Sequence, residues 1–269
     1  MIQDVINASF LAIIEGITEF LPISSTGHLI LAENWFPLQG DKTFQDTFLV
    51  VIQFPAILAV LLYFYKTLLP PLNNTDEMKN WFFLWVKIGI AFIPAGILGF
   101  LLDDIIDYYL FNTTTVLISL IIGGIILIGI EKLQIGGKGY NQVTELTVLF
   151  CLGVGLFQCI AMIPGVSRSA ATIIGAMIIG ATRSVAVEFS FYLAIPTLLG
   201  AGGLKLLKHG FHFSFNEWIV LISGSIISFV VAYFVIAFFL KYIKTHDFKI
   251  FGIYRICLGI IIFIIFYLI

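Results

Sequence analysis

The chain is poor in charge: only 11% of its 269 residues are Asp, Glu, Lys or Arg, whereas 60% are hydrophobic. A soluble globular domain carries about 25% charged residues, which it needs to cover a surface that faces water. The net charge of −2 also lacks the basic field that nucleic-acid binding requires. The composition therefore excludes soluble, disordered and nucleic-acid-binding proteins, and it predicts a multi-pass membrane protein.

Cysteines and N-terminal basic residues are also scarce. The cysteines Cys151, Cys159 and Cys257 all lie in apolar runs, which favours small buried side chains over disulfides or metal ligands. The first ten residues contain Asp4 and neither Lys nor Arg, so we expect no cleaved signal peptide. The first apolar segment is therefore expected to remain in the mature protein.

Six apolar segments are long enough to cross a bilayer, because a hydrocarbon core of about 30 Å needs about 20 helical residues. They cover residues 48–65, 81–102, 114–130, 187–204, 218–240 and 250–269. Two further apolar regions, residues 10–35 and 146–180, are interrupted by Pro, Gly, hydroxyl and ionisable residues. Each of these is expected to form two half-helices around a break.

The two interrupted regions resemble each other, which indicates a duplicated chain. Pro22-Ile-Ser-Ser-Thr-Gly-His28 compares with Pro164-Gly-Val-Ser-Arg-Ser169, at a spacing between prolines of 142 (164 − 22). Downstream, Phe54-Pro55 compares with Ile195-Pro196, at a spacing of 141 (196 − 55). We therefore divide the single membrane domain, residues 1–269, into repeats at 1–135 and 140–269.

Each repeat contains one broken hairpin followed by three spans, and an odd number of spans forces the second repeat to enter the membrane upside down. The predicted fold is an all-α polytopic membrane protein with six spanning helices, two re-entrant helix-loop-helix hairpins and an inverted-topology repeat. Broken helices in such folds meet near the bilayer midplane and build the site. Non-helical backbone at that depth needs protein or water to satisfy it.

Loop charges predict the orientation of the chain. If both hairpins are re-entrant, eight basic residues fall on one side: Lys66, Lys79, Lys132, Lys138, Arg183, Lys241, Lys244 and Lys249. The other side receives three: Lys42, Lys205 and Lys208. The positive-inside rule places the larger group in the cytoplasm, which leaves both termini and the mouth of the first hairpin outside.

Two carboxylates precede the first break. Glu15 and Glu19 are four residues apart, so they share one face of a helix ahead of Pro22. An ionised side chain in the hydrocarbon region costs about 2.5–3.5 kcal/mol on insertion scales, which makes the pair a functional signal. The alternative is a helix at the interface with its acids in water. Apolar sequence on both sides of the pair favours the functional interpretation.

A run of hydroxyls follows Pro22. Ser24, Ser25 and Thr26 are expected to cap the next half-helix, whose unpaired backbone N–H groups and positive dipole suit a phosphate. His28 lies in the same turn. A lone His on an apolar face is more often a satisfied core residue, but the neighbouring acids and hydroxyls favour a functional one.

The second break supplies the complementary charge. A guanidinium such as that of Arg168 clamps a phosphate through two parallel hydrogen bonds, and Ser167 and Ser169 add neutral donors. Thr172 and Gln158 complete the candidate substrate-binding residues on this side. The alternative role for Arg168 is a structural ion pair with Glu15 or Glu19, which is compatible with substrate binding in the loaded state.

Carboxylates repel a phosphate, so their presence beside phosphate donors calls for a bridging divalent cation or a general base. Glu15 and Glu19 are the candidate metal ligands. Both alternatives predict phosphoryl chemistry between the two breaks.

Two motifs resemble the signatures of the undecaprenyl-diphosphatase family, also called bacitracin resistance proteins. They are Glu15-Gly-Ile-Thr-Glu19-Phe-Leu-Pro-Ile-Ser-Ser-Thr-Gly-His28 and Pro164-Gly-Val-Ser-Arg168-Ser-Ala-Ala-Thr172. The second has Ala170 where members often have Gly, a difference expected to affect packing. The resemblance covers nearly the whole chain in length, number of segments and duplicated order.

The resemblance implies hydrolysis of undecaprenyl diphosphate to undecaprenyl phosphate and inorganic phosphate, which recycles the lipid carrier of peptidoglycan synthesis and confers bacitracin resistance. It implies a bacterial cytoplasmic membrane, a site that opens to the outer face, and a divalent cation, Mg²⁺ or Ca²⁺. It also implies catalytic roles for Glu15, Glu19, His28 and Arg168, and Ser25 as nucleophile with Ser24 and Thr26 as phosphate ligands.

Two mechanisms and two functions stay open. Either Ser25 attacks the terminal phosphorus while Glu19 or His28 takes its proton, or a water activated at His28 or the metal attacks directly. The alternative function is a polyprenyl-phosphate transporter, because inverted repeats with broken helices are also a transporter plan. The sequence leaves a homodimer open as well.

Overall fold

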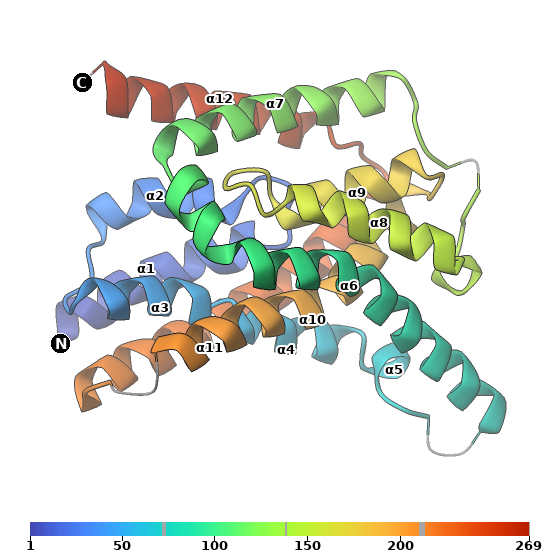
Figure 1. Ribbon diagram of the computed structural model, residues 1–269, viewed down its shortest axis with the longest axis horizontal. Helices are drawn as coiled ribbons and strands as arrows, with labels where there is room; N and C mark the ends of the chain where they lie inside the picture. Colours follow the sequence, from blue (N-terminus) through green and yellow to red (C-terminus); the bar gives the residue numbers. More distant parts are fainter. Residues whose placement is uncertain (72–73, 138, 210–212, 269) are drawn as a thin grey trace.

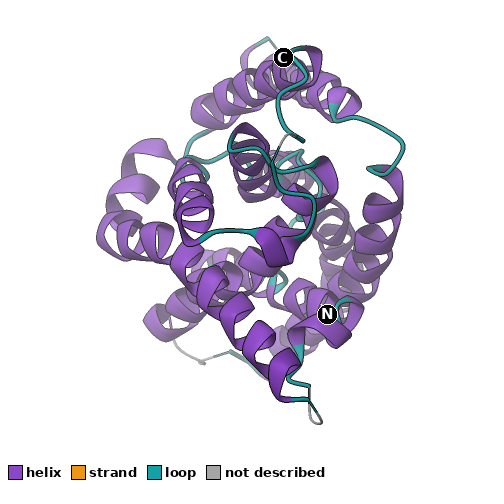
Figure 2. Ribbon diagram, turned by 90° about the vertical axis from the view of Figure 1, so that its right-hand side faces the viewer, coloured by secondary structure: helices purple, strands orange, loops and turns teal. Residues whose placement is uncertain are grey.

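The computed structural model describes residues 1–71, 74–137, 139–209 and 213–268 as a bundle of helices (Figure 1). Within those ranges there is no strand, as the colouring by secondary structure shows (Figure 2). Lys138 and the end of the last predicted span, Ile269, lie outside the described residues, as do the side chains of Lys205 and Lys208.

The helices follow the duplicated order that the sequence predicts. The first half contains α1 (Ile2–Thr18), α2 (Ser25–Trp35), α3 (Lys42–Val51), α4 (Phe54–Tyr63), α5 (Tyr65–Leu68), α6 (Thr75–Leu110) and α7 (Thr113–Lys132). The second contains the 3₁₀ turn η1 (Val143–Glu145), then α8 (Val148–Ile160), α9 (Arg168–Ile178), α10 (Arg183–His209), α11 (Phe215–Tyr242) and α12 (Lys249–Tyr267).

The prediction of six spans is confirmed. Six described segments have the length and hydropathy of a membrane-crossing helix: Lys42–Tyr63, Thr75–Leu102, Thr113–Lys132, Arg183–Gly203, Phe215–Tyr242 and Lys249–Tyr267. They run back and forth along the long axis of the molecule, so that both termini lie at its left-hand end in Figure 1. The predicted orientation requires both termini on the same side of the membrane, and their position at one end of the molecule agrees with it.

The first of these spans, Lys42–Tyr63, has the predicted length and hydropathy but contains a break that the sequence analysis did not predict. It is divided at Ile52 and Gln53 into α3 and α4. Pro55 causes the division, because a proline has no N–H and its ring clashes with the carbonyl one turn earlier. The Ile52 carbonyl accepts a hydrogen bond from the Ser228 hydroxyl of α11 at 2.7 Å instead. The break therefore has its own polar partner inside the bundle.

The two interrupted regions each form a pair of short helices. Figure 1 shows α1 and α2 entering the bundle from the left and α8 and α9 entering it from the right, with both breaks near the middle. Ser24 caps α2 and Ser167 caps α9, each by accepting a hydrogen bond from the N–H three residues on. Both serines have a positive φ, 70° and 75°, which is unusual for a residue with a side chain. The two breaks are therefore built alike.

Helix pairings outside the breaks are also reciprocal. α1 packs on α11 and α8 packs on α6, while α4 packs on α11 and α10 packs on α6. α7 and α12 pack on each other. This pattern is expected of two halves related by a twofold axis, and it supports the predicted duplication. Re-entry of the hairpins and inversion of the repeats stay predictions, because no bilayer accompanies the chain.

The bundle is centred on α10. In the most apolar stretch of α10, 67% of the residues are buried, whereas in that of α6 only 11% are. The cysteines are free, as predicted, but the expectation of buried side chains is wrong for Cys257, which is exposed on α12. An apolar run does not distinguish the inside of a membrane protein from its outer face, because lipid is as apolar as the core.

Two glycines bring the first helix of each hairpin against a neighbouring backbone. A Cβ added at Gly155 of α8 would lie 2.3 Å from the Ala91 carbonyl oxygen of α6. A Cβ added at Gly16 of α1 would lie 2.9 Å from the Ser228 carbonyl oxygen of α11. Small residues allow such close approach between membrane helices.

Gly155→Ala is therefore expected to destabilise the protein by about 1–3 kcal/mol, the usual cost of overpacking. The measurement is the thermal unfolding midpoint in detergent. Gly89→Ala on α6 is the matched control, because a Cβ at Gly89 meets nothing within 4 Å. Equal midpoints for the two variants would contradict the close packing of α8 on α6.

Candidate active site

A cavity of about 480 Å³ lies where the breaks meet. The first break contributes Glu19 and Ser25 to its wall, and the second contributes Ser167 and Arg168. The side facing α6 is apolar and formed by Phe92, Gly96, Gly99 and Phe100. The cavity thus joins a polar end between the breaks to an apolar wall on the most exposed span.

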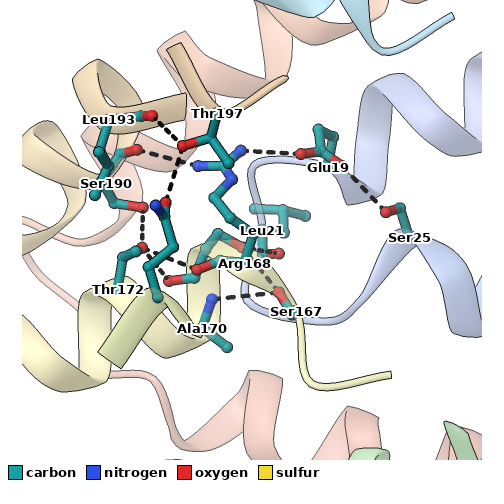
Figure 3. A network of polar contacts seen from close by, with 12 residues as sticks. Glu19, Leu21, Ser25, Ser167, Arg168, Ala170, Thr172, Ser190, Leu193 and Thr197 are labelled. Carbon is teal, nitrogen blue, oxygen red and sulfur yellow. Dashed lines mark hydrogen bonds and ion pairs between the residues drawn. The ribbon is translucent and has the colours of Figure 1, made fainter. Parts of the chain in front are cut away.

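An ion pair connects the two breaks across this cavity. Arg168 Nη2 lies 2.9 Å from Glu19 Oε1, and both side chains are about nine-tenths buried. The other carboxylate oxygen of Glu19 accepts a hydrogen bond from the Ser25 hydroxyl at 3.1 Å (Figure 3). One carboxylate is therefore shared by the arginine of one break and a hydroxyl of the other.

The Arg168 guanidinium is held in place on several sides. Its Nη1 donates to the Ser190 carbonyl of α10 at 3.0 Å, and its Cζ lies 5.7 Å from the centre of the Phe20 ring. Its buried Nε has no hydrogen-bond partner among the described residues. An unsatisfied buried donor is costly, so this N–H is well suited to receive an anion.

Gln158 and Thr197 add a second free donor to the wall. The Thr197 hydroxyl donates to Gln158 Oε1 at 3.1 Å, which orients the amide. The buried Nε2 of Gln158 then has no partner in the described structure. Arg168 and Gln158, which both line the cavity, therefore each have one buried N–H group without a partner among the described residues.

Glu15 is buried behind this wall. Its carboxyl is fully buried, and neither oxygen has a hydrogen-bond partner within the described ranges. It does not line the cavity. The structure therefore separates the two predicted carboxylates into one at the cavity wall, Glu19, and one enclosed in the protein.

The remaining predicted hydroxyls divide between the cavity and the scaffold. Ser24 and Thr26 line the cavity together with Ser25. Ser169 instead donates to the Leu21 carbonyl of the first break at 2.8 Å, and Thr172 shares a 2.7 Å hydrogen bond with Ser190. Neither Ser169 nor Thr172 lines the cavity, so both support its walls from behind.

His28 also lies outside the cavity wall. Its Nδ1 is 2.7 Å from the Ser24 carbonyl, and its Nε2 is 2.6 Å from the hydroxyl of Tyr254 on α12. A carbonyl only accepts, so Nδ1 carries a hydrogen, and the Tyr254 hydroxyl donates to Nε2 when the ring is neutral. Both ring nitrogens are therefore occupied in holding the first break.

Sequence reasoning missed Gln53 and Thr197, which line the cavity. Each lies within two residues of a proline of the second duplicated pair, Pro55 and Pro196. Two polar residues beside matched prolines inside apolar spans were the signal that could have identified them. Ser190 and Tyr254 act through backbone and ring contacts that no local pattern reveals.

No cluster of three or more His, Cys, Asp and Glu side chains suited to a metal ion occurs in the described part of the chain. A divalent cation such as Mg²⁺ is commonly held by one or two carboxylates together with substrate phosphates and water. The unpartnered carboxylate of Glu15 fits that requirement, and Glu19 supplies the second one. The two carboxylates are oxygen ligands of the kind that such a cation prefers, and Glu19 would exchange its present partners, Arg168 and Ser25, to bind one.

These features define an integral membrane protein with a cavity, lined by an arginine and several hydroxyls, between two broken helices. Residues 8–261 match the family described as bacitracin resistance protein BacA. The chain is 52% identical to undecaprenyl-diphosphatase 1 of Clostridioides difficile over 98% of its length and 97% of that protein. It is 50% identical to an undecaprenyl-diphosphatase of Fusobacterium nucleatum, over 96% and 98% of the two chains, and 43% identical to one of Enterococcus faecalis, over 97% of each. The chain belongs to the bacitracin resistance protein BacA family.

Proposed function

We propose that this protein is an undecaprenyl-diphosphatase, which hydrolyses undecaprenyl diphosphate to undecaprenyl phosphate and inorganic phosphate. The observation that carries the proposal is the cavity that joins Ser25, Glu19 and Arg168 to an apolar wall. A diphosphate fits the polar end, and a polyprenyl chain fits the wall along α6. The relatives' names point to the same activity.

Ser25 is the proposed nucleophile. Its hydroxyl attacks the terminal phosphorus and passes its proton to Glu19, to which it already donates a hydrogen bond at 3.1 Å. The bond between that phosphorus and the bridging oxygen breaks, undecaprenyl phosphate leaves, and water then releases phosphate from Ser25. Between the two candidate bases, the contact with Ser25 favours Glu19 over His28, whose nitrogens are bound elsewhere.

Arg168 and the caps of α2 and α9 provide the electrostatic contribution. Arg168 and Gln158 line the cavity in which charge develops during phosphoryl transfer, and each has a buried N–H group without a partner in the described structure. Ser24, Thr26 and Ser167 add neutral donors to the same wall. The substrate then replaces Glu19 as the partner of Arg168, which frees the carboxylate for proton transfer.

Glu15 and Glu19 are the proposed ligands of a divalent cation, which would neutralise phosphate charge when bound. The enclosed, unpartnered carboxylate of Glu15 supports this assignment.

The proposed location is the cytoplasmic membrane of a bacterium. Lys66, Lys132, Lys241 and Lys249 lie at or near ends of α5, α7, α11 and α12, and the positive-inside rule assigns these ends to the cytoplasm. The first hairpin then opens outward, and the proposed cavity releases phosphate at the outer face.

Detergent-purified protein is expected to release phosphate from a polyprenyl diphosphate, and EDTA is expected to reduce that rate by at least about tenfold because the cation screens phosphate charge. The measurement is inorganic phosphate with and without EDTA, followed by Mg²⁺ or Ca²⁺ in excess. Full activity in EDTA would contradict the metal assignment. Lipid translocation in liposomes without any phosphate release would overturn the proposed function in favour of transport.

A further inference from the structure

Arg255 of α12 is fully buried inside the bundle, although it lies in an apolar membrane span. Its guanidinium makes no ion pair with a carboxylate in the described structure and donates only to backbone carbonyls. The distances are 3.3 Å from Nε to Leu120 O, 3.2 and 2.9 Å from Nη1 to Pro22 O and Val166 O, and 3.0 Å from Nη2 to both Ser119 O and Gly165 O. All three of its nitrogens are therefore used.

Three of the five acceptors belong to the two breaks, and the other two, Ser119 O and Leu120 O, belong to α7. Pro22 belongs to the break between α1 and α2, and Gly165 and Val166 belong to the break between α8 and α9. Nη1 joins them directly, because it donates to Pro22 O and Val166 O at once. A single group of α12 thus fixes the position of one break relative to the other.

Peptide geometry connects this contact to the cavity. No cis peptide bond occurs among the described residues, so the N–H of Ser167 points away from the Val166 carbonyl that faces Arg255. Ser167 lines the cavity and is followed by Arg168. Holding the Val166 carbonyl therefore orients the peptide that leads into the anion-binding residue.

The neighbouring residue Tyr254 supports the first break in the same way. Its hydroxyl lies 2.6 Å from His28 Nε2, and its ring stacks on the His28 ring at 5.5 Å between centres. His28 in turn contacts the Ser24 carbonyl at 2.7 Å. Two consecutive residues of α12 therefore reach both breaks from outside the cavity.

Gly123 of α7 makes room for the guanidinium. A Cβ added at Gly123 would lie 2.3 Å from Arg255 Nη2 and 2.8 Å from its Cζ. The space between α7 and α12 is thus shaped to the side chain of Arg255, and a methyl group at position 123 would displace it.

We propose that Arg255 is a positioning residue for hydrolysis: it sets the distance and angle between the nucleophile-bearing first break and the anion-binding second break. The inference rests on the proposed function. Only an arginine carries enough fixed donors for five carbonyls, whereas a lysine ammonium offers three from one point. Arg255 itself does not touch the cavity.

The test is a double-mutant cycle in detergent-purified protein, read as kcat/KM for phosphate release from a polyprenyl diphosphate. Arg255→Lys is expected to lower it about 100-fold, the cost of displacing reacting groups by about 1 Å. Arg168→Lys is then expected to cost less than about tenfold in the Arg255→Lys protein, because the guanidinium it removes is already misplaced. The control is Arg183→Lys, which is expected to keep wild-type activity. Arg183 follows the C-terminal end of α9, whereas Arg168 begins this helix, and it pairs with Glu131.

A second pair of variants reaches Arg255 without changing it. Gly123→Ala is expected to lower kcat/KM about tenfold through a smaller displacement. Gly129→Ala on the same helix is expected to leave it unchanged, because a Cβ there meets nothing within 4 Å.

The inference would be overturned if the fold-losses of kcat/KM caused by Arg255→Lys and Arg168→Lys multiplied in the double variant. Wild-type kcat/KM in the Arg255→Lys protein, or equal kcat/KM in the two glycine variants, would also overturn it. Absence of phosphate release by the unmodified protein would instead remove the proposed function. The two failures are therefore distinguishable.

Discussion

Replacing Ser25 by alanine is expected to reduce phosphate release from a polyprenyl diphosphate by at least about 10³-fold, because a covalent mechanism has no substitute for its nucleophile. The hydroxyl already donates to Glu19 Oε2 at 3.1 Å, so Ser25→Ala removes both the attacking oxygen and the donor to the base. The measurement is single-turnover phosphate release in detergent.

Thr26→Ala is the matched control for Ser25→Ala. Thr26 is the next hydroxyl along α2 and lines the same cavity, but it makes no hydrogen bond to Glu19. We expect a loss of less than about tenfold, the value of one neutral hydrogen bond to the substrate. Acid quenching of the unmodified protein should also trap phosphate on Ser25. Unimpaired turnover by Ser25→Ala would instead establish direct attack by water.

Arg168→Lys is expected to lower kcat/KM by about 10²- to 10³-fold, with KM raised at least tenfold, because a planar fork for the diphosphate is replaced by a point charge. The side chain is about nine-tenths buried, lines the cavity and has an Nε without a hydrogen-bond partner among the described residues. The measurement is the initial rate of phosphate release over a range of substrate concentrations, which gives kcat and KM separately.

The alternative role for Arg168 is an ion pair that only holds the two breaks together. A purely structural pair predicts a lower thermal midpoint for Arg168→Lys with an unchanged KM. Arg183→Lys is again the control, since the partner of Arg183 is Glu131 and not a cavity residue. An unchanged KM would therefore assign Arg168 to the scaffold.

The predictable part of the fold is the part encoded locally. Each span is a long apolar run, and each break is marked by proline, glycine and a capping serine, so six spans and two interrupted regions follow from the sequence. The break at Ile52 and Gln53 was missed, because one proline in an apolar run does not reveal whether a helix bends or divides there. The carbonyl of Ile52 at this break accepts its hydrogen bond from Ser228, which is 176 residues away in sequence.

The candidate site was predictable for the same reason and to the same extent. Glu19, Ser25 and Arg168 come from two motifs, and the structure brings them into contact. Arg255 was missed because it lies in an apolar run without a motif, although a lone arginine within a span is itself a functional signal. Its role depends on five carbonyls distributed over three segments, which no local pattern contains.

The two breaks share a capping serine with a positive φ, but the residues on either side of it differ. The residue after the capping serine begins the following helix in both: it is Ser25 in α2 and Arg168 in α9. Equivalent places on opposite walls therefore carry a nucleophile and a cation. An unaltered duplication would have produced a cavity that accepts a diphosphate equally in either direction. This difference between Ser25 and Arg168 gives the cavity a polarity, so that in the proposed mechanism only one end of the diphosphate meets the attacking oxygen.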